Sequence, residues 1–315
     1  MEKCSIIIAS YNEAGNLKKC LNSIRDLDYP KEVLEIIVVD NNSSDNTSEI
    51  VGQFPEVIYL KEYRQGAAFA RNRGITKAGG KILVFLDADT TVDRNWLRQL
   101  TAPFEDPGIG AVGGAISPID KNNIFSLYLG VSLFMRYPLY GQKREVRGYP
   151  SCNLAVRREL IDGGFDTSAF STYGEDKDIC YRILEKGFKV LFQPEAKICH
   201  RHPGTMAELF GLFVKSSAGR ADFAKKYPMA PDILLFNLHI PLVYTLILLF
   251  ALFVQGIKAF LMAASPALVY LLYSSTLSFM KSKDFLLSFV VKPLFDVLSV
   301  YIIYVSYQFR KLKRR

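Results

Sequence analysis

The chain has 315 residues, of which half are hydrophobic, and a formal net charge of +8. That is long enough to bury a full core and still carry an appendage. Nine Lys and Arg face three Asp and Glu from Pro231 onward, so the basicity belongs to the C-terminal part, which argues against nucleic acid as a partner. The five cysteines form no C-x-x-C pair, and their odd number favours a reduced, cytosolic compartment.

Apolar runs alternate with helical spacings along the first part of the chain. We expect strands at residues 5–9, 33–39 and 57–60, with helical segments after the first two runs. The first run follows an acidic Glu2 and is too short for a signal peptide, so we read it as a strand. This alternation predicts an α/β fold with a mostly parallel sheet.

Polar clusters follow each of these runs. The first run leads into Ser10, Tyr11 and Glu13, and the second ends in Asp40 and reaches Asp45. Strands of a parallel sheet end at the same edge, so we expect these side chains to gather along one rim.

The stretch 81–91, KILVFLDADTT, combines a buried-strand pattern with two carboxylates, Asp87 and Asp89. A buried carboxylate costs several kcal/mol unless it is paired or bound to a metal. The pair therefore indicates a divalent-cation site at the carboxyl edge of the sheet. The alternative is a capped turn, because Asp and Thr also suit turns and helix N-caps.

Gly66 precedes a helical segment that carries Arg71 and Arg73. Arginines near an acidic cation site suit a diphosphate, although solvated arginines on an amphipathic helix have the same pattern. The sequence GIGAVG at 108–113 matches a dinucleotide-binding motif by letter. We reject that function because the motif must open a helix, whereas this one leads into a β-like run. No P-loop sequence is present.

Two further groups have possible chemistry in the second half of this region. Glu175 and Asp176 begin a helical pattern, where they act either as a helix-capping acidic pair or as a general base. His200 and His202 follow a short strand at 196–199, itself preceded by one at 189–193. Either histidine is a candidate to complete the cation site, and surface histidines without a role have the same pattern.

Taken in order, the motifs from Lys3 to His202 resemble the family-two inverting glycosyltransferases of the GT-A fold. The motifs are IIIASYNE, VVDNNSSDNT, QGAAFARNRG, FLDADT, SCNLAVRRELIDGGFD, GEDKDICYRILEKG and ICHRH. The resemblance implies a nucleotide-sugar donor, usually a uridine nucleotide, and single-displacement transfer that inverts the anomeric centre.

The resemblance also implies roles for particular residues, here and below by their numbers in this chain. Asp176 is the implied catalytic base, with Glu175 beside it and Asn153 lining the acceptor side. The implied ligands of Mg²⁺ or Mn²⁺ are Asp89, Asp87 and His200, with His202 as the alternative. The residues implied to bind the nucleotide sugar are Ser10, Tyr11, Glu13, Asp40, Arg71, Asp87 and Asp89.

One departure separates the chain from the processive polysaccharide synthases of this family. They carry a Q-x-x-R-W sequence after the catalytic acid, whereas the only tryptophan here is Trp96. We therefore expect the transfer of a single sugar. Glu175 is expected to raise the pKa of Asp176 by like-charge repulsion.

The C-terminal part has three long apolar stretches, at 233–255, 257–280 and 285–309, followed by a basic tail. The first two are long enough to cross a bilayer and form a tight hairpin. The third contains Lys292 and Asp296, and we expect it to be interfacial or re-entrant with both near the headgroups, because an even number of crossings keeps the basic tail on the cytosolic side. Residues 207–227 suit an amphipathic helix on an anionic membrane surface.

The sequence therefore predicts a GT-A domain at 1–206, an interfacial helix or linker at 207–230 and a membrane region at 231–315. The expected function is a multi-pass cell-membrane enzyme with a cytosolic catalytic domain, which moves one sugar to a lipid-linked or other membrane glycan. Two alternatives remain: transfer directly to polyprenyl phosphate, and a non-catalytic scaffold that binds sugar nucleotides.

Overall fold

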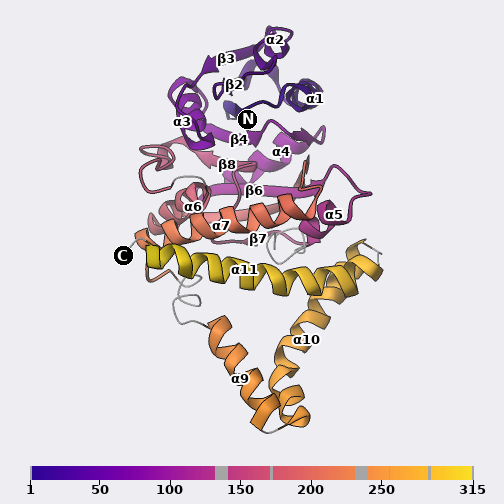
Figure 1. Ribbon diagram of the computed structural model, residues 1–315. Helices are drawn as coiled ribbons and strands as arrows, with labels where there is room; N and C mark the ends of the chain where they lie inside the picture. Colours follow the sequence, from indigo (N-terminus) through magenta and orange to yellow (C-terminus); the bar gives the residue numbers. More distant parts are fainter. Residues whose placement is uncertain are drawn as a thin grey trace. The chain divides into compact units, whose positions relative to one another are not determined.

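The computed structural model describes residues 2–131, 141–170, 173–230, 240–254, 256–282 and 285–313 (Figure 1). These residues form two compact units. The α/β unit consists of Met1–Ile119 and Tyr140–His202, and the helical unit consists of Asp120–Leu139 and Pro203–Arg315. The segment that contributes to the helical unit before residue 140 therefore interrupts the α/β unit in sequence.

The α/β unit alternates strands and helices in its first half and is richer in strands in its second half. Its strands are β1 (Cys4–Ser10), β2 (Leu34–Asp40), β3 (Val57–Lys61), β4 (Ile82–Asp87), β5 (Thr90–Val92), β6 (Ile109–Pro118), β7 (Arg144–Glu145), β8 (Asn153–Arg157) and β9 (Lys189–His200). Its α-helices are α1 (Ala14–Arg25), α2 (Thr47–Val51), α3 (Ala67–Lys77), α4 (Trp96–Thr101) and α6 (Glu175–Glu185).

The described strands form one mixed sheet in the order β3-β2-β1-β4-β8-β6-β9-β5, with β7 paired to β9. The first four strands in this order are parallel, as the alternating pattern predicts. Strand β8 is antiparallel to both β4 and β6, and β6 is parallel to β9. The α/β prediction is confirmed.

The register brings the predicted polar clusters to one edge of the sheet. Ser10 pairs with Asp40 across β1 and β2, and Ala9 pairs with Asp87 across β1 and β4. The carboxyl ends of the three strands are therefore level, which confirms the shared rim.

One element differs from the sequence-based expectation. The sequence predicts separate short strands at 189–193 and 196–199, but β9 runs through both. The register between β6 and β9 shifts at Gly114 and Ile116, so the extra residues around Pro194 bulge while pairing resumes beyond them.

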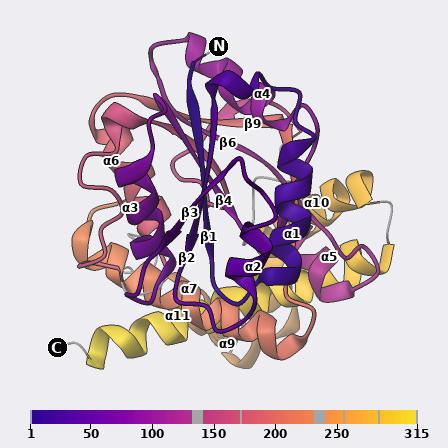
Figure 2. The same ribbon diagram turned by 90° about the horizontal axis from the view of Figure 1, so that it is seen from above.

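Helices cover both faces of the sheet: α3 and α6 lie on one side, and α1 and α4 lie on the other (Figure 2). Helix α1 buries Leu17, Leu21 and Ile24 at helical spacing, as its sequence predicts. Helix α3 approaches β1 closely at Gly74, where an added Cβ would lie 2.4 Å from a methyl of Ile7.

The helical unit gathers segments that are far apart in the sequence. Its helices are α5 (Ile124–Val131), α7 (Met206–Lys226), α9 (Ile240–Val254), α10 (Ile257–Ser282), a π-helical turn at Leu287–Val291 and α11 (Lys292–Lys313). Within this unit α11 packs along α7, whereas α9 and α10 form a hairpin (Figure 1). Its core contains Tyr128 of α5, Phe213 of α7 and Phe295 of α11.

Two helices of the described residues are long and apolar enough to cross a membrane, Ile257–Thr276 and Leu287–Gln308. The first predicted stretch lies partly outside the described residues, and its described part contains the shorter apolar helix Val243–Val254. Lys292 and Asp296 are both buried and pair with each other at 2.5 Å from Nζ to Oδ2. Length and composition alone make these helices possible membrane segments.

Candidate functional site

The carboxyl edge of the sheet brings together two aspartates and a histidine. His200 Nε2 lies 3.3 Å from Asp89 Oδ1 and 3.7 Å from Asp87 Oδ2. Strand β4 ends at Asp87, and β5 starts at Thr90, whose antiparallel partner on β9 is His200. The pairing of β5 with β9 therefore places the imidazole beside both carboxylates.

His202 is the less suitable of the two candidate histidines. Its ring centroid lies 5.5 Å from that of His200, and its side chain is buried. The contacts to Asp87 and Asp89 are made by His200. The geometry thus favours His200 as the third member of the cation site, and His202 stays the alternative prediction.

The charged groups of this cluster shift one another's pKa values. Burial alone would lower the pKa of His200, but hydrogen bonds to Asp87 and Asp89 outweigh burial and raise this pKa to about 10. Burial likewise would raise the pKa of Asp87, yet Arg71 and His200 hold it well below its ordinary range. In the absence of a metal, a protonated imidazole thus sits against two carboxylates.

Arg71 joins this cluster to the second acidic pair. Its Nη2 donates to Asp87 Oδ1 at 2.9 Å and its Nη1 donates to Glu175 Oε1 at 3.1 Å. The guanidinium is buried, and among the described residues its Nε has no partner. Helix α3 therefore supplies a cation between the end of β4 and the start of α6.

The loop before α6 packs against Arg71. The guanidinium lies over the ring of Phe165, 5.5 Å from its centroid. Asn72, the next residue on α3, donates to the carbonyl of Phe165 at 2.8 Å and accepts from its N–H at 2.7 Å. The Gly163–Asp166 motif thus positions an aromatic face under the bridging arginine.

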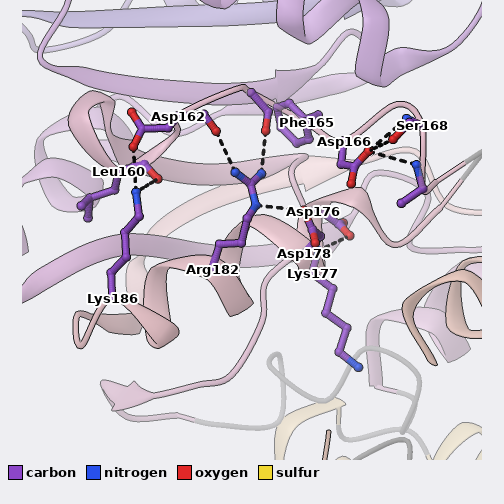
Figure 3. Close-up of polar contacts among 12 residues, drawn as sticks. Leu160, Asp162, Phe165, Asp166, Ser168, Asp176, Lys177, Asp178, Arg182 and Lys186 are labelled. Atoms are coloured by element: carbon purple, nitrogen blue, oxygen red, sulfur yellow. Dashed lines mark hydrogen bonds and ion pairs between the residues drawn. The ribbon is translucent and has the colours of Figure 1, made fainter. Parts of the chain in front are cut away.

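Arg182 of α6 ties the same loop to the helix (Figure 3). It donates to the carbonyls of Asp162 and Gly164 and to the Asp178 carboxylate, at 2.9, 2.6 and 3.0 Å. Asp166 accepts hydrogen bonds from the backbone and hydroxyl of Ser168, which closes the following turn. The loop and the first turn of α6 therefore form one connected block.

Asp176 lies in the first turn of α6, as the sequence predicts. It is half-buried, and its carboxylate accepts from the N–H groups of Lys177 at 2.7 Å and Ser151 at 3.4 Å. Burial raises the pKa of Asp176 and, together with the charge of Asp176, raises the pKa of Glu175 to about 7. Burial is thus the largest cause of both shifts, and the like-charge repulsion is the second cause for Glu175.

The predicted nucleoside residues line the ends of β1 and β2. Tyr11 is exposed, and the buried hydroxyl of Ser10 has no hydrogen-bond partner among the described residues. Asp40 accepts from Tyr59 Oη at 2.7 Å and from Ser43 N at 2.9 Å. Asp40 is therefore fixed within the rim.

The two loops at this end of the rim are connected to each other. Asn12 has a positive φ of 54°, and its side chain accepts from Ser44 N at 2.8 Å. Glu13 accepts from Asn16 at 2.6 Å and lies 3.7 Å from Arg201. The role of Glu13 in nucleotide binding remains a prediction.

Asn153 is buried, and its amide bonds to helix α4 and to two other strands of the sheet. It accepts from Trp96 Nε1 at 2.8 Å and donates to the carbonyls of Ala115 and Ala196, each at 3.1 Å. These bonds connect β8 with β6 and β9 and leave no free amide group toward an acceptor. The acceptor-side role that the resemblance implies remains a prediction.

Sequence reasoning did not identify Asn41 or Cys152. Asn41 bonds the carbonyls of Glu62 and Arg64 and the N–H of Gly66, so it fixes the loop that starts α3. Cys152 lies with Asp87 and His200 in a group whose ligand atoms are all within 4.8 Å of one another. The asparagine-rich turn after β2 was the one sequence feature that pointed to Asn41. No sequence feature pointed to Cys152.

The residues present fit a divalent cation. Carboxylate oxygens suit Mg²⁺ and Mn²⁺, and an imidazole beside them is an acceptable ligand for Mn²⁺. His200 Nε2 lies within 3.7 Å of a carboxylate oxygen of Asp87 and within 3.3 Å of one of Asp89, so the three side chains adjoin at the end of the sheet. A cation held there would replace the imidazole proton as the positive charge between the carboxylates.

The mixed, mostly parallel α/β sheet with acidic pairs at its carboxyl edge is of the GT-A-like class of glycosyltransferase folds. Residues 5–165 match the family model described as glycosyl transferase family 2. The chain belongs to this family.

Sequence and structure comparisons identify relatives. The chain is 33% identical over 211 residues to glycosyltransferase AglE of Haloferax volcanii, which covers 62% of this chain and 66% of AglE. It is 27% identical over 215 residues to a dolichyl N-acetyl-glucosaminyl phosphate glucuronosyltransferase of Methanococcus voltae, covering 62% and 65% of the two chains. The chain spans about half to two thirds of the length of the curated relatives it matches.

A solved structure confirms the fold. A mannosyltransferase from Pyrobaculum calidifontis, in complex with GDP-Man and Mn²⁺, superposes with a TM-score of 0.63 at 22% identity and covers 98% of this chain and 88% of that chain.

Proposed function

We propose that this protein is a metal-dependent, inverting glycosyltransferase that moves one sugar from a nucleotide sugar to a membrane-associated glycan acceptor. The observation that supports this most is the arrangement of two acidic pairs at one edge of the sheet, joined by a buried arginine. Arg71 contacts both Asp87 and Glu175. One pair suits a cation and the other a base.

The residues have distinct tasks in this proposal. When bound, Mg²⁺ or Mn²⁺ offsets the negative charge that develops on the leaving diphosphate. Asp176 accepts the proton of the attacking hydroxyl, and Arg71 keeps the carboxylates of Asp87 and Glu175 in fixed positions. Attack from the side opposite the leaving group then inverts the anomeric centre.

The donor and acceptor follow from separate arguments. A UDP-sugar is the proposed donor, from the motif resemblance, although the archaeal mannosyltransferase is described with GDP-Man. The Methanococcus relative acts, by its description, on a dolichyl-phosphate-linked sugar. A polyprenyl-linked glycan is therefore the proposed acceptor, with polyprenyl phosphate itself as the alternative.

The first experiment measures sugar transfer from labelled UDP- and GDP-sugars to a lipid extract by the full chain in detergent. We expect transfer that requires Mn²⁺ and falls about 10²–10⁴-fold in Asp176→Asn, since the proton acceptor is removed. Asp162→Asn, an exposed carboxylate of the neighbouring loop, serves as the control and should retain activity.

The outcomes separate the three candidate functions. Labelling of free polyprenyl phosphate, with no labelling of lipid-linked sugar, would favour the alternative acceptor. Donor binding without transfer, unchanged by Asp176→Asn, would instead support a non-catalytic scaffold.

We further propose that the α9–α10 hairpin crosses the membrane while α7 and α11 lie along its cytosolic surface. Helix α7 carries exposed Lys215 and Lys225, and its charges disfavour a membrane span. Because α11 packs along α7, it would lie with α7 at the surface even though it is long enough to cross.

The exposed side of α11 and its preceding turn fits this placement. An apolar stripe runs along it, formed by Leu286, Val290, Leu294, Val297, Leu298 and Val305. By contrast, α10 exposes apolar side chains such as Leu261, Leu268 and Tyr273 along its length, as a lipid-facing helix does. The stripe thus suits the boundary between headgroups and acyl chains.

Depth measurements can test this arrangement. The helical unit has no native cysteine, so single cysteines at Val290 and Val305 can be labelled in a Cys199→Ser background. The two positions are about 22 Å apart along a helix. Equal quenching by brominated lipid at one depth supports a surface helix, whereas widely different depths would show that α11 crosses.

A further inference from the structure

Strand pairing, rather than sequence spacing, places a thiol in the cation site. Strand β8 is antiparallel to β4 with Asn153 opposite Leu86, so Cys152 lies opposite Asp87 as the two strands end. The pairing of β5 with β9 adds His200 from the other side. Among the described residues, Asp87, Cys152 and His200 form the group of ligand atoms that lie within 4.8 Å of one another.

This group differs chemically from the oxygen-rich set that the sequence predicts. Both sets contain Asp87 and His200. The oxygen-rich set adds Asp89, whereas the present group adds Cys152. Carboxylates prefer Mg²⁺ and Mn²⁺, whereas a thiolate selects softer ions such as Zn²⁺. Two overlapping ligand sets therefore compete for the same aspartate and histidine.

The dimensions suit a small tetrahedral ion. Zinc binds sulfur at about 2.3 Å and imidazole nitrogen at about 2.0–2.1 Å, so neighbouring ligand atoms of a tetrahedral zinc lie roughly 3.5 Å apart. The ligand atoms of the group lie within 4.8 Å of one another, so side-chain movements of no more than about 1 Å would bring them to zinc-binding distances. Cys152 is buried, so the ion would bind away from bulk water.

We propose that Asp87, Cys152 and His200 form a thiolate-containing site that takes Zn²⁺ or Cd²⁺ and thereby excludes Mn²⁺. As the ion binds, metal–ligand bonds replace the S–H bond of Cys152 and the N–H bond of the His200 imidazolium that faces the carboxylates, and both protons pass to solvent. The inference rests on the proposed cation role of this edge of the sheet and adds Cys152 as the residue that determines which cations bind.

The test titrates the full chain in detergent with Cd²⁺ alone and follows the ultraviolet charge-transfer band of a cadmium–thiolate bond. We expect the band in the wild type, in the matched control Cys180→Ser and in Asp89→Asn, and its loss in Cys152→Ser. Cys180 is also buried but lies outside the group. Zn²⁺ affinity, measured by titration calorimetry, should fall at least about tenfold in Cys152→Ser.

Mn²⁺ binding, followed by loss of the free-ion electron paramagnetic resonance signal, separates this inference from the proposed function. Retained Mn²⁺ binding in Cys152→Ser shows that the variant is folded and that the thiol is specific to soft ions. No band in the wild type, or an unchanged band in Cys152→Ser, overturns the inference while leaving Mn²⁺-dependent transfer untouched.

A measurement on the wild type covers the case in which Cys152→Ser does not fold. Zn²⁺ should slow the alkylation of Cys152, detected by mass spectrometry, without slowing that of Cys199. Equal alkylation rates of Cys152 with and without Zn²⁺ would contradict the proposal.

Discussion

The protonated side chain of His200 supplies the positive charge that a bound metal ion would otherwise supply. Its protonated ring lies between two carboxylates that would otherwise repel each other, and they raise the pKa of the ring to about 10. In the metal-free protein, the proton on His200 thus offsets negative charge of the two carboxylates. Cation binding therefore becomes an exchange of a proton for a metal.

The exchange makes Mn²⁺ affinity depend on pH. Since the pKa of His200 is raised, the ring is charged at all pH values below about 10 and must lose its proton to bind metal. Affinity should fall by about tenfold for each unit of decreasing pH, as measured by titration calorimetry in buffers of different ionisation enthalpy. His200→Asn should flatten this dependence, and an unchanged slope would exclude proton release from His200.

The acid side of the pH–rate profile reports on Asp176. Burial raises the pKa of this carboxyl, so the base is lost as the pH falls through a value above the ordinary one of about 3.9. Because burial is the larger cause, Glu175→Gln should leave this acid limb of kcat/KM in place. A shift of the limb to lower pH by about one unit would show that repulsion by Glu175 dominates instead.

The candidate site was only partly predictable from its residues. Asp87 and Asp89 follow a buried run that ends at the carboxyl edge, so their position could be inferred from the parallel pattern. His200 was a candidate by residue type, and its approach to them depends on the antiparallel pairing of β5 with β9. The position of Cys152 could not be inferred, because its approach depends on the antiparallel pairing of β8 with β4. Asn153 was assigned by motif alone, and its buried hydrogen bonds are visible only in three dimensions.

At the scale of elements, close packing of α3 on the sheet determines where Arg71 points. Gly74 lies one turn after Arg71 and allows the helix to approach Ile7 of β1. The strands and helices here were readable from the sequence, because their apolar positions repeat at strand and helix periods. The sequence did not predict that the two expected strands form the single strand β9, because a bulge accommodates the residues around Pro194.

Gly74→Ala tests this packing. Its added methyl would lie 2.4 Å from Ile7 Cγ2, so we expect the free energy of unfolding to fall by about 1–3 kcal/mol. Gly15→Ala on α1 meets no atom within 4 Å and should be neutral or stabilising by up to about 1 kcal/mol. Chemical denaturation measures both, and equal effects would show that the approach of α3 to β1 is not tight.

At the scale of the whole molecule, the chain builds the helical unit from two separated segments. Tyr128 of α5 donates to Asp296 of α11 at 3.1 Å, and Lys292 bonds both Asp296 and Ser274 of α10. A buried polar cluster therefore connects three helices. Sequence periodicity gave no indication of α5 or of its place in this unit.

Removing one member of the buried pair should destabilise the helical unit strongly. Lys292→Ala leaves the Asp296 charge buried beside Tyr128, which typically costs about 3–5 kcal/mol. The double variant Lys292→Met/Asp296→Leu removes both charges and should cost much less. Thermal unfolding in detergent compares them, and equal losses would indicate that packing rather than charge pairing holds the helices.

The interrupted path of the chain also has a consequence for the order of synthesis. Helix α5 leaves the ribosome well before α7 and α11, the partners that bury Tyr128 and Leu129. At typical rates of about 5–20 residues per second, the last partner arrives roughly ten to thirty seconds later. During that interval the apolar side of α5 is not yet covered by these partners. The core of the helical unit can form completely only after α11 has been synthesised.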